Sequence, residues 1–265
     1  MINLNLAKKI AKYLFIIQIT LYLIYAILIL SGKILVINSV LWGNFFTSSI
    51  SLIAVISLIS FLYSEAGKQG IDPKGNKILT LSLIFMFLGD LLWFLNELFL
   101  ENLVPIGGWP DISWNISHIL LIWSFLHFSE SIFSESLRWK AGILTAGILT
   151  AIINAIISLR EYFNLGIYGI SFIIQEIYPI YDFIIIGILL TIIGPLIVNQ
   201  DKTFKGFYII LFGLLARIVY DNLFADLILN GSYYTGHIID LIYVIFYIGI
   251  CLSSICYLKE WKRDD

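Results

Sequence analysis

Eight apolar segments, each close to the length of a membrane-crossing helix, constrain what this chain can fold into. An α-helix rises about 1.5 Å per residue and needs roughly 20 apolar residues to cross a bilayer. Short stretches rich in charged and turn residues separate the segments. The sequence therefore predicts an all-α integral membrane protein, with helices near residues 10–31, 34–63, 77–100, 113–134, 141–158, 170–198, 206–229 and 236–258.

The composition agrees with this class. Hydrophobic residues make up 60% of the chain and charged residues 13%, whereas soluble domains carry roughly 25% charged residues. No stretch between the segments is long enough for a soluble domain, so we expect one polytopic domain over 1–265. The net charge of −2 argues against nucleic acid as a partner. Nucleotide-binding, serine-hydrolase and zinc-protease motifs are absent from the sequence, and we expect neither a cofactor nor a metal.

The distribution of Lys and Arg predicts the orientation, because positively charged connections stay in the cytoplasm. With the N-terminus inside, 13 of the 16 cationic residues fall on the inner side. Only Lys33 and Arg160 fall outside, and Arg217 lies within a predicted helix. We therefore expect a multi-pass protein of the cell membrane with both termini in the cytoplasm and the lipid bilayer as its surroundings.

An internal repeat supports the count of eight helices. The segment 89–93 lies 127 positions before 216–220, and 111–114 lies 129 positions before 240–243, with aromatic residues at matching places. A shift of four helices preserves the direction of each crossing. The sequence therefore predicts two parallel four-helix repeats, with halves near 1–135 and 136–265.

Ionisable residues inside the predicted helices mark a candidate site, because charges in a bilayer are costly and usually face a polar interior. In this topology they gather in the outer half. Asp90 and Glu97 share one helical face, and Arg217 can pair with Asp221 four residues later. We predict an outward-facing acidic and aromatic cavity, with ligand-binding residues Asp90, Trp93, Glu97, His118, Asp182, Arg217, Asp221 and Asp240.

Structural explanations compete with this one. Polar side chains also hold membrane helices together through hydrogen bonds, and Arg217 with Asp221 or Asp90 could form a plain buried ion pair. For Asp226 and Asp240, near the membrane interface, a structural role is favoured. A cap or surface position is favoured for His237.

Three short pieces carry a first resemblance: GDLLWFLNE at 89–97, YPIYDFIIIG at 178–187 and DLIYVIFYIG at 240–249. They resemble polytopic membrane modules at the N-termini of some diguanylate cyclases and histidine kinases. The resemblance implies a sensory role. No cyclase, kinase or PAS domain follows in this sequence, so we expect a separate signalling partner.

A second resemblance is to YhhN-type lysoplasmalogenases, whose pattern has a Gly-Asp in helix 3, a His in helix 4 and an Asp in helix 7. Gly89-Asp90, His118 and Asp221 stand at comparable places, although Tyr220 replaces the Ser of the family pattern. The resemblance implies a lipid hydrolase that uses Asp90, His118 and Asp221. We favour a binding or sensory module for a small-molecule or lipid ligand from the outer side. The intramembrane hydrolase is the alternative.

Overall fold

The computed structural model describes residues 2–69, 72–100, 108–132, 177–189, 205–229 and 231–260, with the single positions 145, 148, 152 and 192. The elements are α1 (Leu4–Leu30), α2 (Lys33–Ile37), α3 (Ser39–Leu62), α4 (Glu65–Gln69), α5 (Pro73–Leu100), α6 (Trp109–Ile132), α9 (Lys205–Leu229) and α10 (Asp240–Glu260). A further helical segment runs over Ile177–Leu189. Most of the predicted helix 141–158, and most of 170–198 outside that segment, lie outside the described residues.

Five of the helices are long and apolar enough to cross a membrane: Leu4–Leu30, Ser39–Leu62, Pro73–Phe99, Gly206–Ile228 and Asp240–Lys259. Large apolar side chains stand exposed on α1, such as Ile27 at 64% and Leu30 at 69% of their surface. Lipid would cover such side chains, since a soluble surface this apolar would aggregate. The fold is that of a helical membrane protein. The count of eight spans, the repeat and the sidedness of the termini stay predictions.

The predicted helix 34–63 is interrupted by Asn38. This residue has a φ of 95°, which ends α2, and its side chain accepts a hydrogen bond from the Leu41 backbone N–H at 2.9 Å, which starts α3. Asn tolerates positive φ better than most residues, and its short side chain is a good helix cap. The hydropathy pattern shows only a continuous apolar segment at this point, which explains why the interruption of the helix was not predicted.

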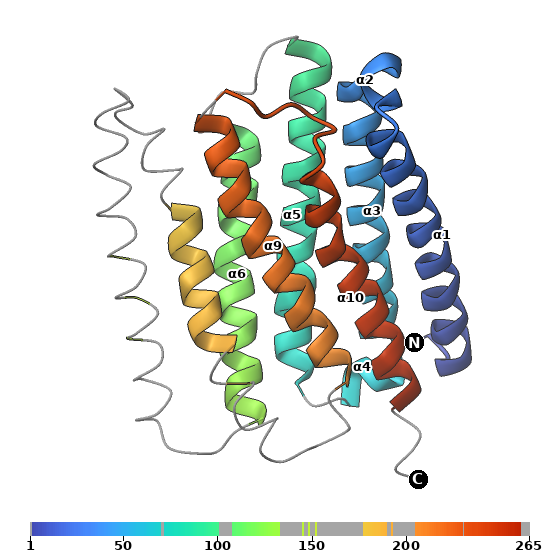
Figure 1. Ribbon diagram of the computed structural model, residues 1–265. Helices are drawn as coiled ribbons and strands as arrows, with labels where there is room; N and C mark the ends of the chain where they lie inside the picture. Colours follow the sequence, from blue (N-terminus) through green and yellow to red (C-terminus); the bar gives the residue numbers. More distant parts are fainter. Residues whose placement is uncertain are drawn as a thin grey trace.

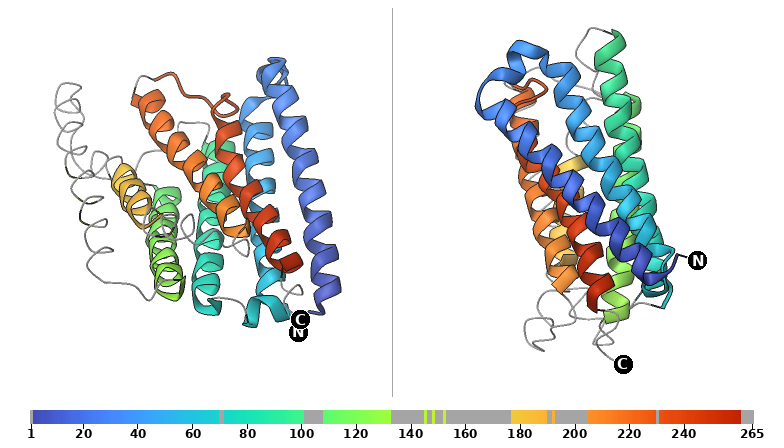
Figure 2. Two further views of the ribbon diagram at one scale, coloured as in Figure 1. Left: turned by 60° about the horizontal axis from the view of Figure 1, so that its bottom comes forward. Right: turned by 90° about the vertical axis from the view of Figure 1, so that its right-hand side faces the viewer.

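The helices pack side by side as a bundle. α5 contacts α6 and α3, α9 contacts α10, and α10 also contacts α3 and α1. α1 and the segment 177–189 lie on opposite sides of the described bundle (Figures 1 and 2). The start of α1 and the end of α10 lie at the same end of the bundle (Figure 1).

The half of the bundle near that end has an apolar core, in which Leu79, Leu83 and Phe125 are fully buried. Two hydroxyl groups tie α5 and α6 together there. Ser82 donates to the Ser117 carbonyl at 2.8 Å, and Ser124 donates to the Gly75 carbonyl at 2.9 Å. Small hydroxyl residues allow close helix packing in lipid. Most of the buried ionisable residues lie toward the other end: Asp90, Asp111, His118, Asp182, Arg217 and Asp240.

Candidate functional site

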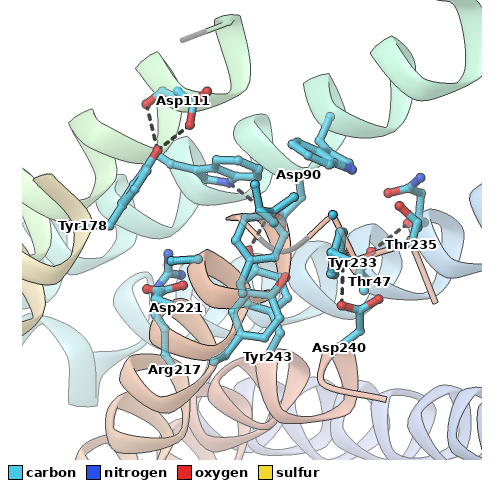
Figure 3. Close-up of a pocket in the computed structure, with 18 residues that line it drawn as sticks. Thr47, Asp90, Asp111, Tyr178, Arg217, Asp221, Tyr233, Thr235, Asp240 and Tyr243 are labelled. Carbon is cyan, nitrogen blue, oxygen red and sulfur yellow. Dashed lines mark hydrogen bonds and ion pairs between the residues drawn. The ribbon is translucent and has the colours of Figure 1, made fainter. Parts of the chain in front are cut away.

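A cavity of about 280 Å³ lies at the end of the bundle where α3, α6 and α10 begin and α5 and α9 end. The segment 177–189 and the connection 231–239 also contribute to its lining (Figure 3). Ligand pockets usually measure roughly 300–1,000 Å³, so this one suits a small molecule. Five of the eight predicted binding residues line it: Asp90, Trp93, Arg217, Asp221 and Asp240.

The other three predicted residues lie behind the lining. Glu97 accepts hydrogen bonds from Thr235 Oγ1, at 2.8 and 2.7 Å, and from Asn44 Nδ2 at 2.5 Å. Thr235 and Asn44 are themselves lining residues. His118 and Asp182 are buried next to Asp221. The structure therefore brings all eight residues to one region, in two layers.

Asp90 is held in place by three neutral donors. Its Oδ1 accepts hydrogen bonds from Trp114 Nε1 at 3.1 Å and Tyr243 OH at 2.5 Å, and its Oδ2 accepts from Tyr247 OH at 2.8 Å. Only 5% of the residue is exposed. Both oxygens thus accept hydrogen bonds, and the carboxyl group is fixed in position in the cavity wall.

Gly89 explains how Trp114 comes so close to Asp90. A Cβ atom at position 89 would lie 2.3 Å from Trp114 Nε1 and 2.4 Å from its Cδ1. Such separations are far below van der Waals contact. The Gly-Asp step of α5 therefore has a steric cause: the glycine admits the indole ring, and the indole N–H then bonds the aspartate.

Arg217 is the cation of the site and is 4% exposed. Its Nε lies 3.3 Å from Asp221 Oδ2, so the ion pair expected from the four-residue spacing is present. Its Nη2 lies 3.4 Å from His118 Nε2. The guanidinium carbon also lies 5.6 Å from the ring centroids of Tyr243 and Phe246. Burial of a charge is costly, and these contacts offset that cost.

His118 is fully buried and its tautomer is fixed by the backbone. Nδ1 lies 2.7 Å from the Trp114 carbonyl oxygen. Because a carbonyl only accepts, Nδ1 carries the hydrogen, and Nε2 of the neutral ring presents its lone pair. That nitrogen lies 3.7 Å from Asp221 Oδ2. The ring stacks on Tyr181, with centroids 5.3 Å apart.

One group of side chains could hold a metal ion. Ligand atoms of His118, Asp182 and Asp221 all lie within 4.8 Å of one another. The sequence analysis expected no metal and did not foresee this grouping. The Arg217 guanidinium already contacts the same Asp221 oxygen, and a second cation beside it would be repelled. In the arrangement found, Arg217 supplies the positive charge that these carboxylates need.

Asp240 begins α10 and organises the connection 231–239. It accepts hydrogen bonds from Tyr25 OH at 3.2 Å, Tyr233 OH at 3.1 Å and the Gly236 backbone N–H at 2.8 Å. These contacts are of the structural kind that the sequence analysis favoured for it. Tyr233 lies outside the membrane-spanning helices. Removal from water, reinforced by the nearby Asp240, raises the pKa of its phenol well above the ordinary value, so it stays a donor.

Five aromatic side chains form a continuous face of the cavity, which we call the aromatic wall. Consecutive ring centroids lie 5.7 Å apart for Trp114 and Trp93, 6.2 Å for Trp93 and Phe224, 5.5 Å for Phe224 and Tyr220, and 4.6 Å for Phe224 and Tyr233. These separations are typical of stabilising aromatic pairs. The wall supplies apolar contact area that a ligand would meet, since all five residues line the cavity.

Other candidates of the sequence analysis lie elsewhere. His237 is in the connection 231–239, where its Nδ1 accepts from the Ile239 backbone N–H at 3.4 Å, in keeping with a cap. Asp226 is exposed on α9.

Several residues of the site were not predicted. Asn44, Thr47 and Thr235 are uncharged, and nothing in the sequence separates them from ordinary packing residues. Tyr25 lies 215 positions from Asp240, so no local spacing could link the two. A signal did exist for Phe224, which lies four residues after Tyr220 on one helical face.

The fold and the site together define a helical membrane protein with a small acidic and aromatic cavity at one end of its bundle. Comparisons with protein-family models, curated proteins and solved structures find no match for the chain. The two resemblances noted in the sequence therefore stay interpretations.

Proposed function

We propose that this protein is a ligand-binding membrane module of sensory type, which takes a small molecule into the cavity at the end of its bundle. The observation that carries the proposal is the combination of an aromatic wall with charges that are already fixed in position. Aromatic surface supplies contact area, and a few oriented polar groups supply specificity. Three donors from within the bundle hold Asp90 in position.

Fixed groups of this kind favour binding over catalysis. A general base must reach a reacting proton with a free lone pair. Asp90 already accepts three internal hydrogen bonds, which lower its basicity, and Arg217 Nη2 lies 3.4 Å from His118 Nε2. These groups would orient a bound molecule through their charge without exchanging protons with it.

A sensory role needs an element that responds to occupancy, and the connection 231–239 is suited to it. Tyr233 and Thr235 line the cavity, and each also bonds an acidic group of the bundle, Asp240 and Glu97 respectively. A ligand that contacts Tyr233 would change how this connection rests on α3 and α10. A separate signalling partner would read that change at the outer end, or through the helices that the connection joins.

The binding proposal is tested with purified protein in nanodiscs and a panel of small cationic, zwitterionic, neutral and anionic metabolites. A ligand should raise the thermal unfolding midpoint in a saturable way. Trp93→Ala should abolish that increase. Trp123→Ala is the matched control, because Trp123 is 50% exposed on α6 and is not part of the lining. A shift of equal size in both variants would refute binding in the cavity.

The second candidate function is an intramembrane lipid hydrolase, and one observation favours it. His118 Nε2 lies 3.7 Å from Oδ2 of Asp221, which lines the cavity. If Arg217 moved aside, His118 could take a proton from a water that attacks a bound lipid. Incubation with lysoplasmalogens and other lysolipids tests this candidate. Turnover by the wild type that is lost in His118→Gln would support the hydrolase and refute the binding proposal. No turnover by the wild type would refute the hydrolase.

A further inference from the structure

The charges that line the cavity do not balance. Among the described residues that line it, the three carboxylates of Asp90, Asp221 and Asp240 face one guanidinium, that of Arg217. Asp221 is ion-paired with Arg217. The hydrogen bonds that fix Asp90 and Asp240 come from neutral phenol, indole and amide groups. Neutral donors hold an ionised carboxylate in place without cancelling its charge, so the cavity favours cations over anions when Asp90 and Asp240 are ionised.

The aromatic wall lies against these charges. Trp114 links the two features directly, because its ring contacts Trp93 and its N–H bonds Asp90. Phe224 and Tyr233 continue the wall, and the Tyr233 hydroxyl bonds Asp240. The face of an aromatic ring is electron-rich and attracts a cation that is placed over it.

We infer that the cavity binds an organic ammonium ion, with its positive nitrogen over the aromatic wall between Asp90 and Asp240. The inference rests on the proposed binding function and names its ligand class. The observation that points to an ammonium ion is that aromatic rings and fixed carboxylates line one small cavity.

A metal ion fits this part of the cavity less well. Hard cations require several free oxygen ligands at about 2.0–2.6 Å, and the Asp90 and Asp240 oxygens are already engaged by internal donors. An alkylated ammonium is weakly hydrated and needs no directional ligands. It gains from aromatic faces and from net negative potential, which are the two features present.

The same nitrogen chemistry could come from a free ammonium metabolite or from a lipid headgroup, and the experiment separates them. Protein is placed in nanodiscs of phosphatidylglycerol, which contain no ammonium lipid. Choline represents the free ion, and lysophosphatidylcholine represents the headgroup. The controls are 3,3-dimethylbutan-1-ol, the uncharged isostere of choline, and lysophosphatidylglycerol. Binding is measured by isothermal titration calorimetry.

We expect choline, lysophosphatidylcholine or both to bind at least about tenfold more tightly than the matched uncharged or anionic control, a difference of about 1.4 kcal/mol. Trp93→Leu should weaken that binding about tenfold. Trp93→Phe, which keeps an aromatic face, should retain most of it. Trp123→Leu on the outside of α6 should bind as the wild type does, since that ring does not line the cavity.

Equal affinity for choline and its isostere would overturn the ammonium assignment, as would binding that Trp93→Leu leaves unchanged. The absence of binding by choline and by lysophosphatidylcholine would also overturn it. The proposed binding function would still hold after those results if another molecule of the panel binds and its binding depends on Trp93. The binding function is refuted if no molecule of the panel shows binding that depends on Trp93.

Discussion

Replacement of Gly89 by alanine should separate the indole of Trp114 from Asp90. The added methyl carbon would lie 2.3 Å from Trp114 Nε1 and 2.9 Å from its Cε2. Ordinary carbon contacts lie near 3.5–4.0 Å, so the ring must move by about an ångström or more. The hydrogen bond to Asp90 starts at 3.1 Å and cannot survive a displacement of that size.

Three contributions set the magnitude. Overpacking of a close-packed site costs about 1–3 kcal/mol. Loss of an interhelical hydrogen bond in lipid costs about 0.6–1.7 kcal/mol. Alanine in a helix interior gains about 1 kcal/mol over glycine. We therefore expect the free energy of unfolding of Gly89→Ala to fall by about 0.6–3.7 kcal/mol, although the substitution improves helix propensity.

Equilibrium unfolding in mixed detergent micelles, followed by tryptophan fluorescence, measures this change. The same substitution in a Trp114→Ala background is the control, because no ring remains to collide with the methyl group. There Gly89→Ala should be neutral or stabilising by up to about 1 kcal/mol. Equal destabilisation in both backgrounds would refute the steric explanation, as would a Gly89→Ala protein as stable as the wild type.

Three further changes probe the rest of the site. Arg217→Met leaves Asp221 without its cation and should lower the free energy of unfolding by about 3–5 kcal/mol. The double variant Arg217→Met/Asp221→Leu should lose less stability than Arg217→Met alone. If the losses of the two single variants simply added in the double variant, that result would contradict the ion pair. Thr235→Val removes the hydroxyl that bonds Glu97 and should speed amide hydrogen exchange across 231–239. Gly43→Ala places a methyl 2.9 Å from Thr235 Cγ2 and should expose the same connection to limited proteolysis; unchanged cleavage would argue against close packing there.

The parts of this fold that could be predicted are those that depend on local sequence. A bilayer requires long apolar helices, so the hydropathy pattern located α5, α9 and α10 to within a few residues. The interruption at Asn38 was missed, because a single residue in an unusual backbone conformation leaves the apolar pattern unchanged.

The candidate site likewise contains contacts that local sequence predicts and contacts that depend on how the helices pack. The spacing of Arg217 and Asp221 predicted their ion pair, since a helix places residues four apart on one face. The partners of Asp90 are 24, 153 and 157 positions away, and such contacts depend on how the helices pack. Sequence could indicate that Asp90 needs partners in a membrane, but it could not name Tyr243 and Tyr247 as two of them.

The predicted repeat gives the cavity a simple interpretation. Trp93 and Trp114 match Tyr220 and Tyr243 in the repeat, and each pair is in contact, with centroids 5.7 and 4.6 Å apart. Each pair also spans two neighbouring helices, α5 with α6 and α9 with α10.

In the predicted repeat, Asp90 of the first half corresponds to Arg217 of the second half. Arg217 is ion-paired with Asp221 on α9, whereas Asp90 lies on α5 among neutral donors. If the cavity binds an ammonium ion as proposed, that ion would lie toward Asp90 and away from the Arg217 guanidinium, because like charges repel. If the two halves are repeats, the difference at this one position would therefore set the orientation of the ligand.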